Sequence, residues 1–282
     1  MWQKRSKTVF IASVAVVGIL LLQMGLYALH VLFGTSLGVN LFQFCHSLLQ
    51  MWGLWPLGLL LNGLIVYTMA MLLAGMVRQA LASGRTWRKL NSSRDEELTR
   101  RLNKRYGRDG GVLVIGHDEP LALTMGLLQP KIVVSSGLVR LLDEGELAAV
   151  LYHEQFHQRY RDPLKTFLLS LAAAVIWYVP VLKWLHLQYK IAREILADSY
   201  AMQELGSEAE LGGALLKLLK RGTPRQMPFA YASFADTSIN YRIHRILDPQ
   251  AEPGAMKLPI GPLVVSAHVV AALSVLFVMA LL

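Results

Sequence analysis

Three long apolar stretches dominate the hydrophobic pattern of this chain. Residues 8–33, 53–77 and 258–282 each contain no Asp, Glu, Lys or Arg. A helix of about 20 apolar residues is long enough to cross the hydrocarbon core of a bilayer. The first stretch is also longer than the apolar core of a cleavable signal peptide. The pattern therefore predicts three transmembrane helices, the first two of which form an N-terminal hairpin within residues 1–84.

Basic residues lie beside these stretches and indicate their orientation. They are Lys4, Arg5 and Lys7 before the first stretch, and Arg78, Arg85, Arg88 and Lys89 after the second. Because basic flanks tend to stay in the cytoplasm, we expect both groups to be cytoplasmic and the uncharged 34–52 segment to lie outside. This orientation explains the net charge of +9, so we expect no direct contact with nucleic acid.

The composition agrees with a multi-pass protein of the cell membrane whose constant partner is the lipid bilayer. Hydrophobic residues make up 54% of the 282 positions, and the mean hydropathy is +0.41. A soluble domain of this size is less apolar. The single cysteine, Cys45, excludes an internal disulfide framework and a cysteine-based metal site.

Residues 85–250 are more polar and predict a domain that contains both helices and strands. Residues 94–105 have the charge pattern of a solvent-facing helix, and residues 141–159 predict one helix with acidic side chains in its first turn. Three short extended segments predict a small sheet: Val112–Ile115, Leu121–Gly126 and Lys131–Ser135. The expected fold is a mainly α integral membrane protein with an α+β domain before its last membrane helix.

The predicted 141–159 helix carries His153, Glu154 and His157. Four residues advance a helix by about 400°, so the two imidazoles lie on one face and can bind one zinc ion together. Glu154 lies about 100° further round, where a carboxylate can take a proton from water on the metal and pass it to the leaving amine of a peptide. The spacing is that of a zinc peptidase, although the same residues could form an ordinary polar helix face.

A second helix supplies candidates for the rest of a metal site. Glu194 and Asp198 stand four residues apart in a helix-forming run. Glu194 would complete a set of three protein ligands for one zinc ion per chain and leave the fourth position to water. Asp198 would accept the second N–H of a ligand imidazole. The alternative is a solvated acidic face.

The apolar segment 166–187 lies between these two helices and is interrupted by Pro180. A single full crossing here would place His153 and Glu194 on opposite sides of the membrane, where they could not share one metal. We therefore predict a re-entrant or interfacial hairpin that returns the chain to the cytoplasmic side. Such irregular backbone is tolerated in a bilayer only where protein covers it.

Several motifs occur in an order and spacing that resemble a known family. They are Ala122-Leu-Thr-Met-Gly126, Pro130-Lys-Ile-Val-Val-Ser-Ser-Gly-Leu138, Glu146-Leu-Ala-Ala-Val-Leu-Tyr-His-Glu154, Arg161-Asp-Pro163 and Glu194-Ile-Leu-Ala-Asp198. Over the region from about residue 110 to 250, the chain resembles the integral-membrane gluzincins. The resemblance is strongest to BlaR/MecR-type peptidases, while HtpX and the CAAX prenyl proteases are more distant.

The resemblance implies a zinc endopeptidase whose active site faces the cytoplasm, and it implies roles for further residues. Arg242 would stabilise the oxyanion of the tetrahedral intermediate, and the bond between Ser233 and Phe234 would be a site of self-cleavage, unless this is a chance dipeptide in a connecting loop. Five residues would hold the substrate as an added strand, although the strands could merely cover the helix: Ala122, Leu123, Thr124, Met125 and Gly126.

One departure from the resembling family concerns sensing. Its sensor members continue into an extracellular penicillin-binding domain, whereas this sequence ends at Leu282. We therefore do not expect direct covalent sensing of a β-lactam.

The expected function is regulated proteolysis, in which the protein cleaves itself, a cytosolic transcriptional repressor, or both. Cleavage of misfolded membrane proteins is an alternative, as is a non-catalytic signalling protein with a structural zinc. The substrate, the activating signal and the oligomeric state are left open by the sequence.

Overall fold

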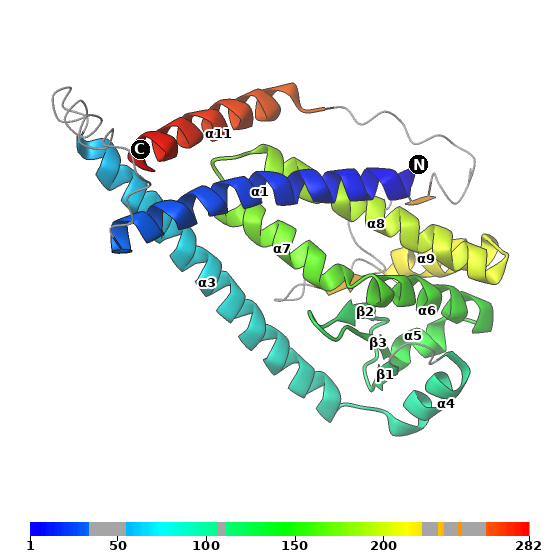
Figure 1. The fold of residues 1–282 in the computed structure, drawn as a ribbon. Coiled ribbons are helices and arrows are strands. Elements are labelled where there is room, and N and C mark those ends of the chain that lie inside the picture. The colour runs from blue at the N-terminus through cyan, green and yellow to red at the C-terminus, as the bar shows by residue number, and fades with distance from the viewer. Residues whose placement is uncertain (34–54, 107–110, 222–230, 234–241, 244–257, 282) are drawn as a thin grey trace. The chain divides into compact units, whose positions relative to one another are not determined.

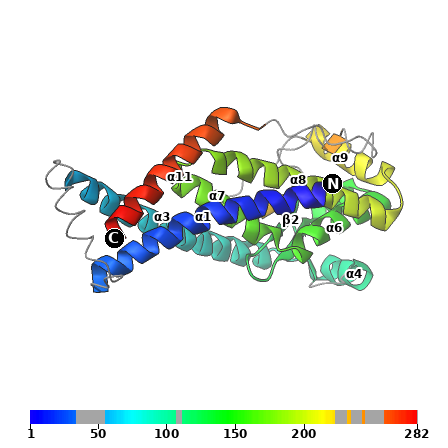
Figure 2. The same cartoon turned by 45° about the horizontal axis from the view of Figure 1, so that its top comes forward.

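The computed structural model describes residues 1–33, 55–106, 111–221, 231–233, 242–243 and 258–281. Its elements are drawn in Figures 1 and 2. The chain divides into two compact units. We call the first the polar unit (Met1–Lys7, Val77–Leu168 and Leu187–Ala255) and the second the apolar unit (Thr8–Met76, Leu169–His186 and Met256–Leu282).

Among the residues that the structure describes, three helices are long and apolar enough to cross a membrane, as predicted. They are α1 (Trp2–Phe33), α3 (Trp55–Ser92) and α11 (Ile260–Leu281). Within the apolar unit, Gln23 of α1 donates a hydrogen bond to Ser274 of α11 at 2.9 Å. Helix α3 continues to Ser92, beyond the predicted end of the span at Val77, because the basic segment that follows contains no helix breaker stronger than Gly84.

The apolar segment 166–187 forms parts of two helices rather than one crossing. Helix α7 (Asp162–Val175) and helix α8 (Val181–Leu205) are joined by a turn at residues 176–180. Pro180 lies immediately before α8, where its missing N–H leaves no helical hydrogen bond unmade. In the apolar unit, Val181 donates its backbone N–H to Ser266 Oγ of α11 at 2.9 Å. The turn between the helices therefore belongs to the same unit as the three candidate spans.

A small four-stranded sheet lies in the polar unit, in the order β1-β3-β2-β4. Its strands are β1 (Val112–Ile115), β2 (Ala122–Met125), β3 (Lys131–Ser135) and β4 (Tyr231–Ser233). Strand β1 is parallel to β3, whereas β2 is antiparallel to both β3 and β4. The first three strands were predicted from the sequence. Strand β4 was not, because its segment is flanked by Pro224 and Pro228 and is typical of a loop.

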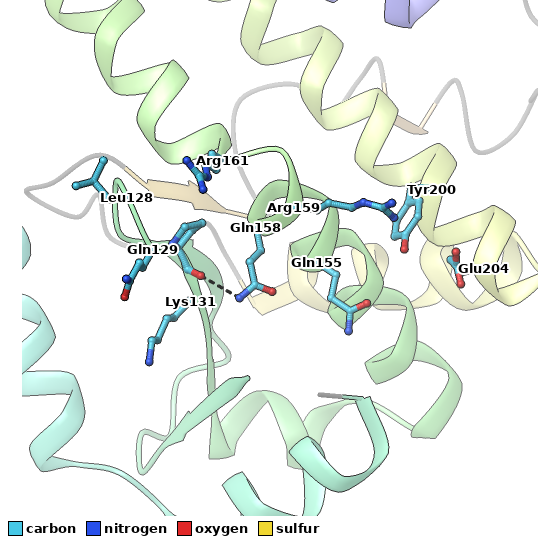
Figure 3. Close-up of a pocket in the computed structure, with 10 residues that line it drawn as sticks. Leu128, Gln129, Lys131, Gln155, Gln158, Arg159, Arg161, Tyr200 and Glu204 are labelled. Carbon is cyan, nitrogen blue, oxygen red and sulfur yellow. Dashed lines mark hydrogen bonds between the residues drawn. The ribbon is translucent and has the colours of Figure 1, made fainter. Parts of the chain in front are cut away.

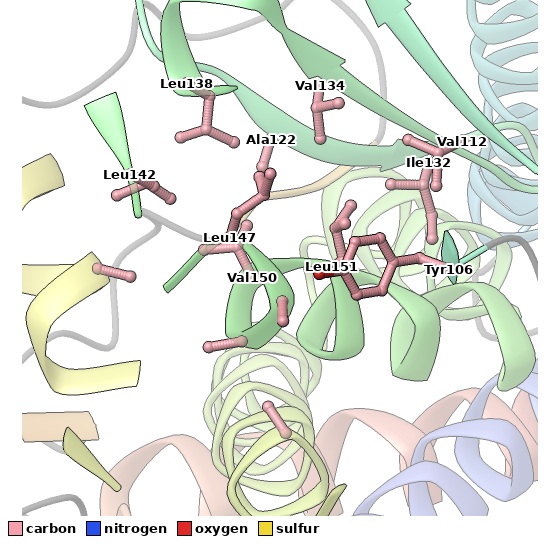
Figure 4. Packing of buried hydrophobic residues seen from close by; sticks show 14 of the residues in the cluster. Tyr106, Val112, Ala122, Ile132, Val134, Leu138, Leu142, Leu147, Val150 and Leu151 are labelled. Atoms are coloured by element: carbon pink, nitrogen blue, oxygen red, sulfur yellow. The ribbon is translucent and has the colours of Figure 1, made fainter. Parts of the chain in front are cut away.

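Among the described residues of the polar unit, α4 (Glu96–Tyr106), α5 (Ser136–Leu141) and α6 (Glu144–Arg159) contact this sheet, and α9 (Ala209–Arg221) packs on α6. Apolar side chains of the sheet and of α6 form the core in Figure 4, among them Ile132 and Val134 of β3 and Val150 and Leu151 of α6. The core holds α6 against β2 and β3.

The start of α6 corrects the predicted 141–159 helix. Asp143 caps α6 with its side chain, and the Glu146 side chain accepts the Asp143 backbone N–H in return. This capping box satisfies two N–H groups that the first turn of a helix leaves without a partner. The residues before it form the separate helix α5, so the long helix begins three residues later than predicted.

Candidate metal centre

Three predicted ligands converge between α6 and α8. His153 Nε2 and His157 Nε2 are 3.2 Å apart, and each lies 3.5 Å from a different carboxylate oxygen of Glu194. Ligand bonds of about 2.0–2.1 Å in a tetrahedral site separate neighbouring ligand atoms by about 3.4 Å. The three side chains are buried. They therefore fit one metal ion, with a fourth position left open.

The charges in this cluster suit a cation. Burial raises the pKa of Glu194, but the hydrogen bond to His153 and the nearby imidazoles outweigh it and lower the pKa below its ordinary value. Burial lowers the pKa of His153, but hydrogen bonds to Asp198 and Glu194 raise it to about 9. A metal ion would replace the proton that this imidazole otherwise holds.

Asp198 supports His153 from behind. Its Oδ1 lies 2.8 Å from His153 Nδ1, which leaves Nε2 for a metal. Arg242 donates to both oxygens of Asp198, from Nε and Nη2, at 2.7 Å each. Burial raises the pKa of Asp198, but the Arg242 charge and the His153 hydrogen bond hold it far below its usual range. Arg242 is fully buried, and its Nη1 is 3.5 Å from Glu194 Oε2.

A matching support for His157 was missed in the sequence. Asp162 Oδ2 lies 2.8 Å from His157 Nδ1 and accepts a second hydrogen bond from Arg193 Nε at 2.8 Å. The Arg193 guanidinium covers the rings of Phe156 at 4.4 Å and Tyr160 at 4.8 Å. The sequence does contain a signal for this support, because Asp162 is an acidic residue five positions after His157. It belongs to the Arg161-Asp-Pro163 motif, which we related to the resembling family but not to the metal site.

Glu154 is fully buried beside this cluster. The Thr124 hydroxyl of β2 lies 2.7 Å from Glu154 Oε2 and 3.0 Å from its backbone carbonyl oxygen. Burial raises the pKa of Glu154, while His157, His153 and the Thr124 hydrogen bond oppose the shift. Its Oε1 is buried and has no hydrogen-bond partner among the described residues. One carboxylate oxygen is therefore held by the sheet, and the other is available to a reacting group.

The predicted substrate strand lies directly against this carboxylate. Four of its five residues form β2, and the fifth, Gly126, follows with φ +103°. A side chain there would place Cβ 2.8 Å from the Gln129 carbonyl oxygen, so this close turn into β3 requires glycine.

A segment of this same chain occupies the outer edge of β2. Strand β4 pairs with β2 so that Ser233 is opposite Leu123 and Tyr231 is opposite Met125. Ser233, one half of the predicted self-cleavage bond, is thus paired with the edge of β2. Phe234, the other half of the predicted self-cleavage bond, lies outside the described residues.

A separate cavity of about 820 Å³ opens in the polar unit. Its walls come from the β2–β3 turn, the end of α6 and helix α8, as Figure 3 shows. The three candidate ligands do not line it.

Comparison with known proteins gives two matches. The profile of the BlaR1 peptidase M56 family matches residues 55–246. The chain is also 25% identical over 139 residues to the regulatory protein BlaR1 of Bacillus licheniformis. That similarity covers 48% of this chain and 23% of the relative, so the chain spans about a quarter of the relative's length.

Proposed function

Because this chain belongs to the BlaR1 peptidase M56 family, whose members are membrane metallopeptidases, we propose that it is a membrane-embedded zinc endopeptidase. The observation that carries the proposal is the convergence of His153, His157 and Glu194 beside the buried Glu154. Structural zinc sites are normally closed by four protein ligands, whereas catalytic sites use three and keep one position open. Three ligands and an adjacent carboxylate favour catalysis over a structural zinc.

The residues of the chain divide the work of peptide hydrolysis. Bound zinc would lower the pKa of a water molecule to about 7 and polarise the peptide carbonyl. Glu154 takes the proton of the attacking water and delivers it to the leaving amine. Thr124 holds one oxygen of that carboxylate in place. Asp198 and Asp162 orient the two imidazoles through their Nδ1 atoms.

The substrate binds as an extended strand along β2. The pairing of β4 with this edge supports the proposal, because a segment of this chain already uses the same backbone groups. It also supports self-cleavage between Ser233 and Phe234, since Ser233 is paired with this edge, opposite Leu123. With tags at both ends, the wild type should yield a C-terminal fragment that Glu154→Gln does not. A fragment that persists in Glu154→Gln would show that another protease made it.

Arg242 is proposed first of all to hold Asp198, because its two shortest contacts go to that carboxylate. The predicted oxyanion role would use the remaining face of the guanidinium, near Glu194. The two roles differ kinetically. Loss of zinc affinity in Arg242→Lys would indicate the support role, whereas a fall in kcat at full zinc occupancy would indicate the oxyanion role.

We propose that the metal centre faces the cytoplasm. Both basic flanks belong to the polar unit, together with the metal helices. In that unit Arg5 Nη2 donates to Gln188 Oε1 of α8 at 2.7 Å. The turn between α7 and α8 belongs to the apolar unit, which supports a re-entrant hairpin.

Cysteines placed at Ser92 and Ser207, with Cys45 replaced by Ser, should be labelled from the same side of the membrane. Labelling from opposite sides would overturn this topology.

The biological role proposed is regulatory cleavage of a cytosolic repressor, of the protein itself, or of both. The name of the similar regulatory protein supports this role over quality control. The test compares membrane and cytosolic proteomes of cells that carry the wild type or Glu154→Gln. Regulation predicts that fragments of one or a few proteins disappear in the variant. Loss of fragments from many misfolded membrane proteins would indicate quality control. Identical fragments in both proteomes would contradict the proposed peptidase activity.

A further inference from the structure

The 820 Å³ cavity is lined by an excess of positive charge. Lys131, Arg159 and Arg161 line it together with one acid, Glu204. Arg159 and Glu204 both lie against the Tyr200 hydroxyl, so their charges largely offset each other. Among the residues that the structure describes, Lys131 and Arg161 have no ion-pair partner. Lys131 packs instead over the Trp87 ring, with Nζ 5.6 Å from the ring centre.

The walls of the cavity are held in place by buried amides of α6. Gln158 donates from Nε2 to the Pro130 carbonyl at 2.9 Å and thereby ties the β2–β3 turn to the helix. Gln155 donates in the same way to the Tyr106 carbonyl at 2.8 Å. Both glutamines are less than one-tenth exposed. The cavity and the metal centre are therefore built on one rigid helix, because Gln158 directly follows His157.

Arg161 occupies an unfavourable backbone position. Its φ is +51°, and it is the only non-glycine residue with a positive φ in the described part of the chain. It directly follows Tyr160, the C-terminal cap of α6, where glycine is the usual residue. A glycine at position 161 would adopt this backbone conformation without strain. The conformation of the chain at the end of α6 therefore does not explain why an arginine stands here. Its side chain lines the cavity and is exposed to an incoming ligand.

The register of β4 shows which part of a bound peptide would reach this cavity. Because β4 is antiparallel to β2, its earlier residues lie toward the C-terminal end of β2, with Tyr231 opposite Met125. Beyond Met125 the chain turns through Gly126 into the residues that line the cavity, Leu128 to Lys131. A substrate strand in the same orientation would direct the residues upstream of its scissile bond toward Lys131 and Arg161.

The geometry points to an acidic subsite: the cavity binds an Asp or Glu side chain of the substrate, N-terminal to the bond that is cut. This inference rests on the proposed peptidase function and adds a substrate class to it. Lys131 and Arg161, which have no ion-pair partner in the described part of the chain, lie beside a fixed amide wall and favour a carboxylate over a neutral or basic side chain.

The test measures binding separately from cleavage. Full-length Glu154→Gln protein in detergent with zinc is titrated with fluorescent peptides that carry Glu or Gln at successive positions upstream of an apolar residue. At one position Glu should improve binding about fivefold, the upper range for a partly exposed ion pair, and high salt should remove the gain. Since β4 competes for the same edge in every titration, the ratio between the two peptides is unaffected.

Two variants identify the cavity as the source of this preference. Arg161→Gly removes the charge and also relieves the positive φ, so the protein should stay folded while the preference for Glu falls. Lys131→Glu together with Arg161→Glu should reverse the preference toward a Lys-containing peptide. Arg101→Gln, on the exposed face of α4, is the matched control and should keep the preference for Glu.

The outcomes separate this inference from the proposed function. Equal binding of Glu and Gln peptides at every position, or a preference that survives Arg161→Gly and the double charge reversal, would overturn the acidic subsite. A wild-type protein that binds the acidic peptide but cuts no peptide would overturn the peptidase function and leave the subsite standing.

Discussion

The two histidines of the candidate metal centre are each held by an aspartate and an arginine, but these pairs come from different parts of the sequence. His157 is supported by Asp162, which lies just after α6, and Asp162 is bound in turn by Arg193 of α8. His153 is supported by Asp198, whose arginine, Arg242, lies 44 positions further along the chain. Both aspartates and both imidazoles are buried.

The two supporting arginines lie on opposite sides of the proposed cleavage bond in the sequence. Arg193 remains next to the ligand Glu194 whatever happens to the later chain. Arg242 follows the proposed cleavage bond between Ser233 and Phe234, so cutting that bond would leave it on the C-terminal fragment. Self-cleavage would then weaken the support of His153 and leave that of His157 intact. If self-cleavage occurs at this bond, the support of His153 would change and the support of His157 would not.

The largest effect should come from removing the imidazoles themselves. His153→Ala combined with His157→Ala leaves Glu194 as the sole described ligand, which is too few for tight zinc binding. The purified variant should retain no stoichiometric zinc by elemental analysis, whereas Glu154→Gln should retain it and lose proteolysis. Zinc that persists in the double variant would place the metal elsewhere.

Replacing the aspartates compares the two supports directly. Asp198→Asn and Asp162→Asn should each weaken zinc binding by about 10- to 100-fold, the usual cost of losing an orienting carboxylate. Asp198→Asn should cost more, because it leaves the bidentate Arg242 buried without its partner. Competition with a zinc chelator measures both. Equal losses would show that the two supports are equivalent.

Replacing the arginines should have a smaller effect on zinc and a visible effect on folding. Arg242→Gln leaves Asp198 ionised and buried, and breaking such a pair costs about 3–5 kcal/mol. Arg193→Gln should cost less, because Arg193 donates one hydrogen bond to Asp162, whereas Arg242 donates two to Asp198. Thermal unfolding of both variants with and without zinc measures the difference. A lower Tm for Arg193→Gln than for Arg242→Gln would contradict the prediction that the Arg242–Asp198 pair contributes more to stability.

The smallest effect for a change of one pH unit concerns the pH dependence of zinc affinity. Without metal, the pKa of His153 is raised to about 9, so the proton it holds at pH 7 is lost as the pH rises through that value. Zinc must displace this proton, and its apparent affinity should therefore rise with pH, by at most about tenfold per unit, between pH 7 and 9. Asp198→Asn should flatten the rise and Asp162→Asn should preserve it. Identical pH profiles in all three proteins would contradict the role of Asp198.

Local spacing was enough to locate part of this protein from its sequence. Charge-free stretches predicted all three candidate membrane helices. Crossing the hydrocarbon core requires about 20 consecutive apolar residues, and such a run is visible in the sequence without knowledge of the fold. Helical periodicity placed His153 above His157, since one turn of α6 fixes that relation by itself. Short, mainly apolar runs bounded by glycine, proline and polar turn residues located β1, β2 and β3.

What the sequence could not decide depends on contacts between distant segments. The strand character of Tyr231–Ser233 arises only from pairing with β2, which no local pattern encodes. The role of Asp162 requires the side chain of Arg193 on another helix, and the contacts of Arg242 require α8 to bring Asp198 to it. The relation of His153 to His157, the acid pair Glu194 and Asp198, and the first three strands therefore follow from short-range patterns. The arginine partners of Asp162 and Asp198 and the occupied sheet edge depend on groups that meet only in the folded chain.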